Sequence, residues 1–317
     1  MPGSYRELDY RIRPAKHAER LMMAETLGRL SSFDDIQNYQ YLGLGSVYFS
    51  DFLLFHRMLG IRDMVNIEAC FWDKQRFHDN VPLRMRQEFG SMSEYWPSID
   101  LSRRTIAWLD YDGRLDKDKL NDLSYFSEHC SSGSLIAISV QCKPELKGIT
   151  GRSAIEDLAV SLGRENVNPT YFDKDLVGEG TANVFREALM TQLIQSLSVR
   201  NSFIADQSEK LEANQVFNFR YKDGAEMLTI GWVISKIADR EAFDNCRFGL
   251  LASYRNDAKP FKIKIPKLTS REVHYLLAQM PTNAPTPLTH GSIPERDATQ
   301  FRELYRYLPQ FVTMDWL

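Results

Sequence analysis

The segment at 41–68 predicts a strand, a glycine turn, a helix and a second strand, and no other segment limits the fold as strongly. The run YLGLG at 41–45 predicts a short strand that ends in glycines, and Ser46 is placed to cap a helix over 47–59. Gly60 closes that helix, and the run MVNIE at 64–68 predicts the second strand. A strand, a crossover helix and a strand in this order commit the chain to parallel pairing and an α/β fold.

Strands and helices continue to alternate through the first half of the chain. The run RTIAWL at 104–109 predicts a strand that stops at an acidic turn, and a helix is predicted over 117–129. The run SLIAISV at 134–140 is apolar nearly throughout, which is typical of a strand buried on both faces of a parallel sheet. A further helix is predicted from Pro14, before the glycine turn.

The second half predicts an antiparallel edge and several capped helices. Two strands, at 216–221 and 227–234, flank an Asp-Gly turn, and another strand is predicted at 248–254. A long helix is predicted after Thr181. Three capping boxes, each predicting a helix start, pair Ser153 with Glu156, Thr269 with Glu272 and Ser292 with Glu295.

These patterns together predict an α/β fold with a Rossmann-like, mostly parallel sheet, an antiparallel edge and flanking helices. The chain has 317 residues, of which 43% are hydrophobic and 26% charged, as in ordinary folded proteins. Because the glycine turn and the acidic strand ends all precede residue 113, we expect one main domain rather than two smaller ones. We expect an N-terminal helical extension at 1–39, a Rossmann-like domain at 40–254 and a C-terminal helical appendage at 255–317.

Charge and cysteine usage restrict the partners and the compartment. Lys and Arg total 39 against 42 Asp and Glu, a net charge of −3. The chain therefore lacks the excess of positive charge that is typical of a dedicated nucleic-acid-binding module. The polar N-terminus and the short apolar runs predict neither a secretory signal nor a membrane span. Four cysteines without a C-x-x-C pair favour a reducing cytoplasm. We therefore expect a cytoplasmic protein, no membrane partner, and a small-molecule or protein acceptor rather than a long nucleic acid.

The glycine turn and the acid after it favour an adenosine-containing ligand. Backbone N–H groups at such a turn can approach a ligand closely, and Glu68, 68 − 45 = 23 residues after Gly45, can accept hydrogen bonds from ribose hydroxyls. A dinucleotide site places a third glycine where Tyr48 stands, which counts against NAD. S-adenosylmethionine has no phosphates and tolerates a looser turn. A tight turn that binds no ligand is the structural alternative.

Asp110 and Asp112 end a predicted strand, at the place where ligands bind in open α/β sheets. Asp110 could hold the ligand, Asp112 could act as a general base toward an acceptor hydroxyl, both could bind a divalent metal, or the turn could be purely structural. The segment at 140–144 after the next strand supplies no Asp-Asn pair, so we expect no metal. The segment at 110–113 lacks the Pro-Pro-aromatic core of adenine and cytosine amino-methyltransferases, which argues against DNA base N-methylation.

Two basic stretches could contact an acidic partner. Near the N-terminus Lys16 lies among Arg11, Arg13 and Arg20 around a helix start, where it could contact the substrate or the carboxylate of the donor, or belong to a solvated face. In the run KPFKIKIPK at 259–267 lysines alternate with apolar residues, the pattern of a strand with one wet face whose edge lysines prevent strand pairing.

The chain also resembles a bacterial family described as "putative O-methyltransferase", of the class I S-adenosylmethionine-dependent fold. The resemblance covers nearly the whole sequence, and no single motif carries it. The matching segments are RPAK at 13–16 with Glu19 and Arg20, YLGLGSVYFSDF at 41–52, IE at 67–68, RF at 76–77, WLDYDG at 108–113 and IPKLTSRE at 265–272.

The resemblance implies a donor site around the glycine turn. It implies that Gly43, Gly45 and Ser46 line the methionine part of S-adenosylmethionine and that Glu68 holds the ribose. The sequence departs from the broader class just before the turn, where Tyr41-Leu42 replaces the usual acidic residue. The amino group of the donor would then be held by Asp51 or Asp110.

The sequence therefore predicts an S-adenosylmethionine-dependent methyltransferase that transfers the methyl group to an oxygen of an unidentified acceptor, with Asp112 as the base. The alternative is a methyltransferase-like binding or scaffold module without turnover, paired with a protein partner in a bacterial complex or with a second copy of the chain. NAD-linked redox chemistry is a third and weaker interpretation.

Overall fold

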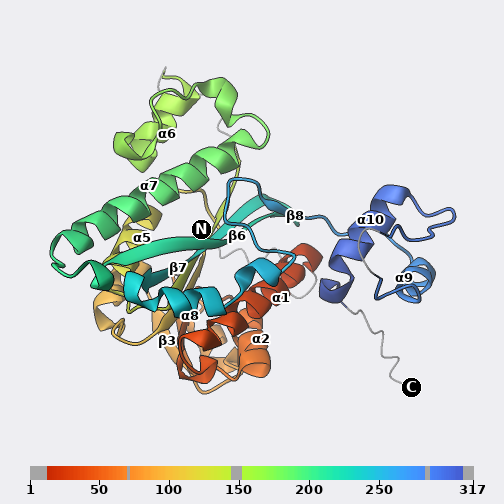
Figure 1. The fold of residues 1–317 in the computed structure, drawn as a ribbon, viewed down its shortest axis with the longest axis horizontal. Helices are drawn as coiled ribbons and strands as arrows, with labels where there is room; N and C mark the ends of the chain where they lie inside the picture. Colours follow the sequence, from red (N-terminus) through yellow and green to blue (C-terminus); the bar gives the residue numbers. More distant parts are fainter. Residues whose placement is uncertain (1–12, 70–71, 144–151, 283–285, 310–317) are drawn as a thin grey trace.

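The computed structural model describes residues 13–69, 72–143, 152–282 and 286–309. An eight-stranded sheet with the order β3-β2-β1-β4-β5-β7-β6-β8 forms its centre (Figure 1). The five strands from β3 to β5 are parallel, β7 is antiparallel to both β5 and β6, and β8 is parallel to β6, so the predicted fold class is confirmed. The strands are β1 (Gln40–Gly43), β2 (Asp63–Glu68), β3 (Arg86–Phe89), β4 (Thr105–Asp110), β5 (Ser134–Gln141), β6 (Leu211–Lys222), β7 (Glu226–Lys236) and β8 (Phe261–Ile263).

Helices cover both faces of the sheet, and each face has its own apolar core. One core lies beneath α1 (Pro14–Gly28), α2 (Ser50–Leu59), α3 (Lys74–Asn80) and α8 (Arg240–Asn245). The other lies beneath α4 (Met92–Tyr95), α5 (Lys117–His129) and α7 (Gly180–Ser202), with α6 (Ala154–Leu162) packed at its margin. The strands β4 and β5 are buried on both faces, as their apolar sequences predict.

Several predicted boundaries are wrong, for local reasons. The apolar run at 248–254 is not a strand but contains the short 3₁₀ helix η10 (Phe248–Leu250), and the last strand of the sheet is β8 instead. This strand lies beyond residue 254, within the segment expected to be the C-terminal appendage. Ser292 and Glu295 form no capping box, because α10 (Glu295–Leu304) begins after Pro294. The boxes at Ser153 and Thr269 are confirmed.

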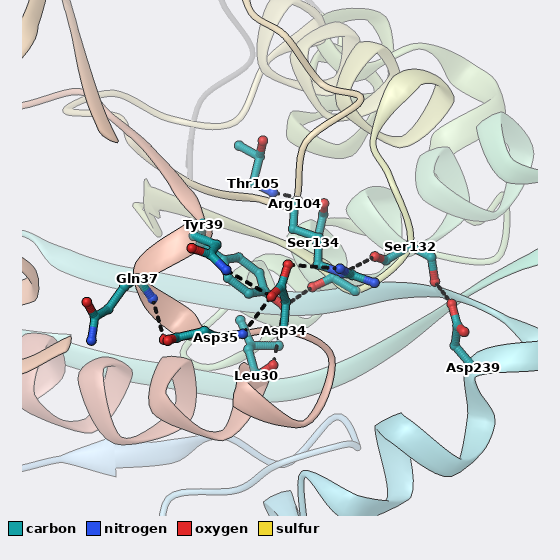
Figure 2. A network of polar contacts seen from close by, with 12 residues as sticks. Leu30, Asp34, Asp35, Gln37, Tyr39, Arg104, Thr105, Ser132, Ser134 and Asp239 are labelled. Atoms are coloured by element: carbon teal, nitrogen blue, oxygen red, sulfur yellow. Dashed lines mark hydrogen bonds and ion pairs between the residues drawn. The ribbon is translucent and has the colours of Figure 1, made fainter. Parts of the chain in front are cut away.

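The N-terminal segment is joined to the amino end of the parallel strands by the polar network that Figure 2 shows. The Arg104 guanidinium donates hydrogen bonds to the carboxylate of Asp34 (3.1 Å) and to the carbonyl oxygen of Ser132 (3.0 Å). The Ser132 hydroxyl in turn donates to Asp239, just before α8. Segments far apart in the sequence are thereby fixed at one end of the sheet, opposite the end where β1, β2 and β4 finish.

The C-terminal helices lie to one side of the sheet (Figure 1). α9 (Ser270–Leu277) and α10 share a small core of their own around Leu276 and Phe301. The Tyr307 hydroxyl donates a 2.5 Å hydrogen bond to Glu25, which links this unit to α1. Within the described ranges, no helix combines the length and the apolar character needed to cross a membrane.

Candidate active site

The carboxyl ends of the parallel strands bring several predicted site residues to one edge of the sheet. β1 lies between β2 and β4, with Gly43 in register with Asn66 on one side and Trp108 on the other. A cavity of about 390 Å³ opens at this edge and is lined by Leu44, Glu68, Asp110 and Asp112, among others. Ligands bind at this position in open α/β sheets, where the strand order reverses on either side of β1 and β4.

The cavity is strongly acidic. Its lining includes one ammonium group, Lys119, whose Nζ lies 2.5 Å from a carboxylate oxygen of Asp116. Apolar side chains such as Ile67 and Met92 form the rest of the wall. Such a lining favours a ligand that carries positive charge as well as an apolar part. The six carboxylates of the lining belong to Glu68, Asp110, Asp112, Asp116, Asp118 and Asp122.

The two glycines of the turn are required by close packing. A Cβ at Gly45 would lie 2.6 Å from the Phe52 ring and 2.8 Å from the side-chain oxygen of Asn66, and a Cβ at Gly43 would meet the Tyr41 hydroxyl at 2.9 Å. The Gly45 N–H donates a 2.5 Å hydrogen bond to that same Asn66 oxygen. The turn is therefore tight because α2 packs directly on β1, and its glycines do not by themselves indicate a ligand.

Ser46 does not cap α2, contrary to the sequence prediction. Residues 46–49 form a turn in which the Phe49 N–H donates to the Ser46 carbonyl oxygen at 3.0 Å. Phe49 is the residue before the helix and has a left-handed conformation, with φ at 45°, and α2 begins at Ser50. The chain bends where Phe49 enters the core, and α2 begins about one turn later than predicted.

Asp51 places a carboxylate beside Tyr41, where the broader class has an acidic residue before the glycine turn. Asp51 lies in the first turn of α2, and its carboxylate accepts a 2.5 Å hydrogen bond from the hydroxyl of buried Tyr41. Burial raises the pKa of Asp51, while the nearby Arg20 charge and the Tyr41 hydrogen bond act in the opposite direction. The described lining of the acidic cavity does not include Asp51.

We expect Asp51→Asn to reduce the pH dependence of stability. Because the pKa of Asp51 is raised above 3.8 in the folded state, the folded protein holds this proton more strongly than the unfolded chain does. The wild-type protein should lose stability as the pH rises from about 4 through the raised pKa, and the variant should lose less. Urea denaturation between about pH 4 and pH 7 measures this difference. A difference between the two proteins that stays constant over that range would contradict the assignment.

Lys16 lies at the centre of a buried ionic cluster. Its ammonium group is 2.8 Å from a carboxylate oxygen of Glu19 and 2.8 Å from one of Asp110, and it lies 4.4 Å from the centroid of the Trp108 ring. Lys16 is 1% exposed and Glu19 is fully buried, so the solvated face considered from sequence is wrong for this part of α1. The cluster connects α1 to the end of β4 and thus to the acidic cavity.

A distant carboxylate holds the start of α1 in place, and the sequence did not reveal it. Asp223, in the turn between β6 and β7, accepts hydrogen bonds from the backbone N–H of Ala15 (3.3 Å) and of Lys16 (2.8 Å). No side chain caps α1 locally at Arg13. A turn Asp after a strand gives no sign in the sequence that it caps a helix 207 residues away.

Asp122 is a buried carboxylate in the cavity wall that the sequence did not reveal. Asp122 of α5 accepts hydrogen bonds from the Tyr111 hydroxyl (2.6 Å) and from the Trp96 indole N–H (2.8 Å). Burial raises the pKa of Asp122, and these two hydrogen bonds oppose the shift. The Tyr111–Asp122 hydrogen bond therefore ties the residue between Asp110 and Asp112 to α5.

The structure thus gathers Glu68, Asp110 and Asp112 around one cavity and places Lys16 behind Asp110. Gly43, Gly45 and Ser46 form the turn beside it, with Asp51 on the α2 side. Within the described part of the chain, no group of three or more His, Cys, Asp or Glu side chains is arranged to hold a metal ion.

Comparisons with solved structures give distant matches. Trm1 from Pyrococcus horikoshii, solved with S-adenosyl-L-methionine, has 9% identity and a TM-score of 0.45, with 72% of this chain and 58% of that chain covered. The O-methyltransferase TomG from Streptomyces achromogenes has 13% identity and a TM-score of 0.34, covering 67% of this chain and 79% of that one. The chain therefore spans little more than half of Trm1. No curated protein matches the sequence.

The strand order, with the antiparallel β7 beside five parallel strands, defines a Rossmann-like α/β fold of the class I methyltransferase type. Over residues 8–316 the sequence matches the family described as "Putative O-methyltransferase", and the chain belongs to that family. The family expected from the sequence is thereby confirmed.

Proposed function

We propose that this chain binds S-adenosylmethionine in the acidic cavity and transfers its methyl group to an oxygen atom of an acceptor. The observation that carries the proposal is the cavity itself, which places six carboxylates and an apolar wall at the carboxyl ends of β1, β2 and β4. When bound, S-adenosylmethionine supplies an electrophilic methyl group on a positively charged sulfur. Negative charge around a cationic ligand and an apolar wall beside its adenine both favour binding.

Different residues would hold different parts of the donor. Glu68, at the end of β2, is placed to accept hydrogen bonds from the ribose hydroxyls, as its position in the cavity allows. Asp110 or Asp51 would hold the α-amino group. Asp110 already carries the Lys16 ammonium on one oxygen, so its other oxygen is the one available for this contact. Gly43, Gly45 and Ser46 would shape the floor under the methionine part.

Asp112 is our candidate for the base. It is exposed, it lines the cavity, and its backbone carbonyl oxygen accepts a hydrogen bond from the Gln141 side chain, which fixes the turn. A carboxylate at this place can accept the proton of an acceptor hydroxyl as its oxygen attacks. The protein otherwise contributes positioning, which makes a reaction between two molecules effectively unimolecular.

S-adenosylmethionine is expected to stabilise the full chain. A ligand that binds only the folded state at 100 times its dissociation constant adds about 2.7 kcal/mol to the free energy of unfolding. A thermal-shift series with S-adenosylmethionine, with NADH as the matched control ligand, measures the effect. A rise in melting temperature with NADH alone would favour the redox interpretation. No shift with either ligand would contradict the proposed donor site.

The scaffold alternative has one observation in its favour, since packing explains both glycines without a ligand. The scaffold and the enzyme are distinguished by incubating the protein with radiolabelled donor and a cell lysate. Label transferred to a small molecule or a protein, and lost in Glu68→Ala, supports an enzyme. Donor binding without any transfer supports a binding module that acts with a protein partner or a second copy of the chain.

A further inference from the structure

We propose that a positively charged cleft beside the donor cavity binds an anionic group, a carboxylate or a phosphate, of the methyl acceptor. The inference rests on the proposed function, because it names the chemical class of the acceptor. The cleft has a volume of about 570 Å³ and is lined by the ends of β6 and β8, the start of α1 and the segment that follows β8.

The cleft lies at the same edge of the sheet as the donor cavity. β6 is antiparallel to β7, which is antiparallel to β5, so β6 runs in the direction of β4 and β5. β8 is parallel to β6, with Tyr221 in register with Ile263. The carboxyl ends of β6 and β8 therefore finish at the edge where β1, β2 and β4 finish.

Three side chains in succession connect the cleft to the donor cavity. Tyr221 lines the cleft, and its ring centroid lies 5.5 Å from the Lys16 ammonium. Lys16 is bound in turn to Asp110, which lines the donor cavity. A group held in the cleft would therefore lie next to the residues that face the donor.

The acidic side chains of the cleft are engaged by the protein itself. Asp223 accepts the two N–H groups at the start of α1, and Glu226 lies 2.5 Å from the Arg220 guanidinium. Glu179 pairs with Lys262, which holds the pKa of Glu179 below its usual range. These three carboxylates are already committed to partners within the protein.

Two of the five cations of the cleft, Arg220 and Lys262, are paired with these carboxylates, and the other three are not. Lys222, Lys264 and Lys267 are exposed, and none of them forms an ion pair with the residues that the structure describes. With Arg220 and Lys262, the lining holds five basic side chains against three acidic ones. The donor cavity, with six acidic side chains against one lysine, has the opposite sign. Adjacent sites of opposite charge suit a cationic donor and an anionic acceptor.

Arg220 is the observation that separates this cleft from a row of surface lysines. Only 5% of Arg220 is exposed, and its Nη2 donates a 3.0 Å hydrogen bond to the Gly178 carbonyl oxygen. The same Nη2 lies 2.5 Å from Glu226, and Nη1 lies 3.8 Å from a carboxylate oxygen of Glu179. Nε and Nη1 are buried and form no hydrogen bond with the described residues. A buried guanidinium with unused donors in the wall of a cleft attracts an anion, because unsatisfied buried N–H groups are costly.

The test uses the full chain and two anions, inorganic phosphate and citrate, at constant ionic strength. Binding is measured by calorimetry in the wild-type protein, in Lys264→Gln/Lys267→Gln and in the control Lys174→Gln/Lys210→Gln, which makes the same charge change outside the cleft. We expect the cleft variant to bind the anions about tenfold more weakly than the wild type, and the control to bind as the wild type does. No anion binding by the wild type, or equal losses in both variants, would overturn the proposal.

Two further measurements on the same proteins separate the possible causes of failure. The stabilisation by S-adenosylmethionine should be unchanged in the cleft variant, and its absence from every protein while anion binding persists would reject the proposed function instead. A labelled single-stranded RNA oligonucleotide is titrated by fluorescence anisotropy. Binding of the RNA that is far tighter than binding of citrate, and lost only in the cleft variant, would replace the small anionic acceptor with a nucleic acid.

Discussion

Glu68→Gln is expected to weaken the binding of S-adenosylmethionine by about 10- to 100-fold, with little change in protein stability. Glu68 lines the donor cavity at the end of β2, where its carboxylate can accept hydrogen bonds from two neighbouring hydroxyls. A hydrogen bond to a charged group contributes about 1.5–3 kcal/mol, and the amide keeps the size of the side chain but not its charge. Calorimetric titration of the donor into the full chain measures the loss.

The matched control is Glu128→Gln, which removes the same charge from an exposed position in α5. Its donor affinity should equal that of the wild type. If Glu68→Gln also binds the donor as the wild type does, Glu68 does not hold the ribose. If both variants lose affinity equally, the effect comes from the net charge of the protein and not from the cavity.

The sequence was most informative where burial is complete. β5 and the helix at 117–129 were predicted closely, because a strand covered on both faces is apolar throughout and an amphipathic helix repeats at its own period. β3 escaped prediction, since its sequence RQEF is polar and it lies at the edge of the sheet. The run at 248–254 is apolar, yet apolar character alone does not distinguish a strand from a short 3₁₀ helix packed on the core.

The candidate site was predictable to the extent that it depends on strand ends. Glu68, Asp110 and Asp112 could be placed together because parallel strands finish at one edge. The contacts that arrange them could not, because they join positions far apart in the chain. Lys16 meets Asp110 across 94 residues, and it meets Asp223 across 207. Only the packing of α1 on the sheet brings these groups together.

Lys16→Met is the change with the largest expected effect on stability, a loss of about 3–5 kcal/mol in the free energy of unfolding. Methionine fills nearly the same space, so the loss does not come from a cavity. It comes from the Glu19 carboxylate, which is fully buried and would lose the ammonium group 2.8 Å away, and from Asp110, which would lose the same partner. Urea denaturation near neutral pH measures the loss.

The control is Arg240→Met, which breaks two ion pairs whose side chains are 40% or more exposed and should change stability by about 1 kcal/mol or less. Lys16→Met/Glu19→Leu should be more stable than Lys16→Met alone, because the unpaired carboxylate is removed with its partner. If Lys16→Met costs no more than Arg240→Met, the buried cluster does not hold α1 on the sheet. If the double variant recovers stability but binds the donor more weakly than the wild type, Lys16 also positions Asp110 for the ligand.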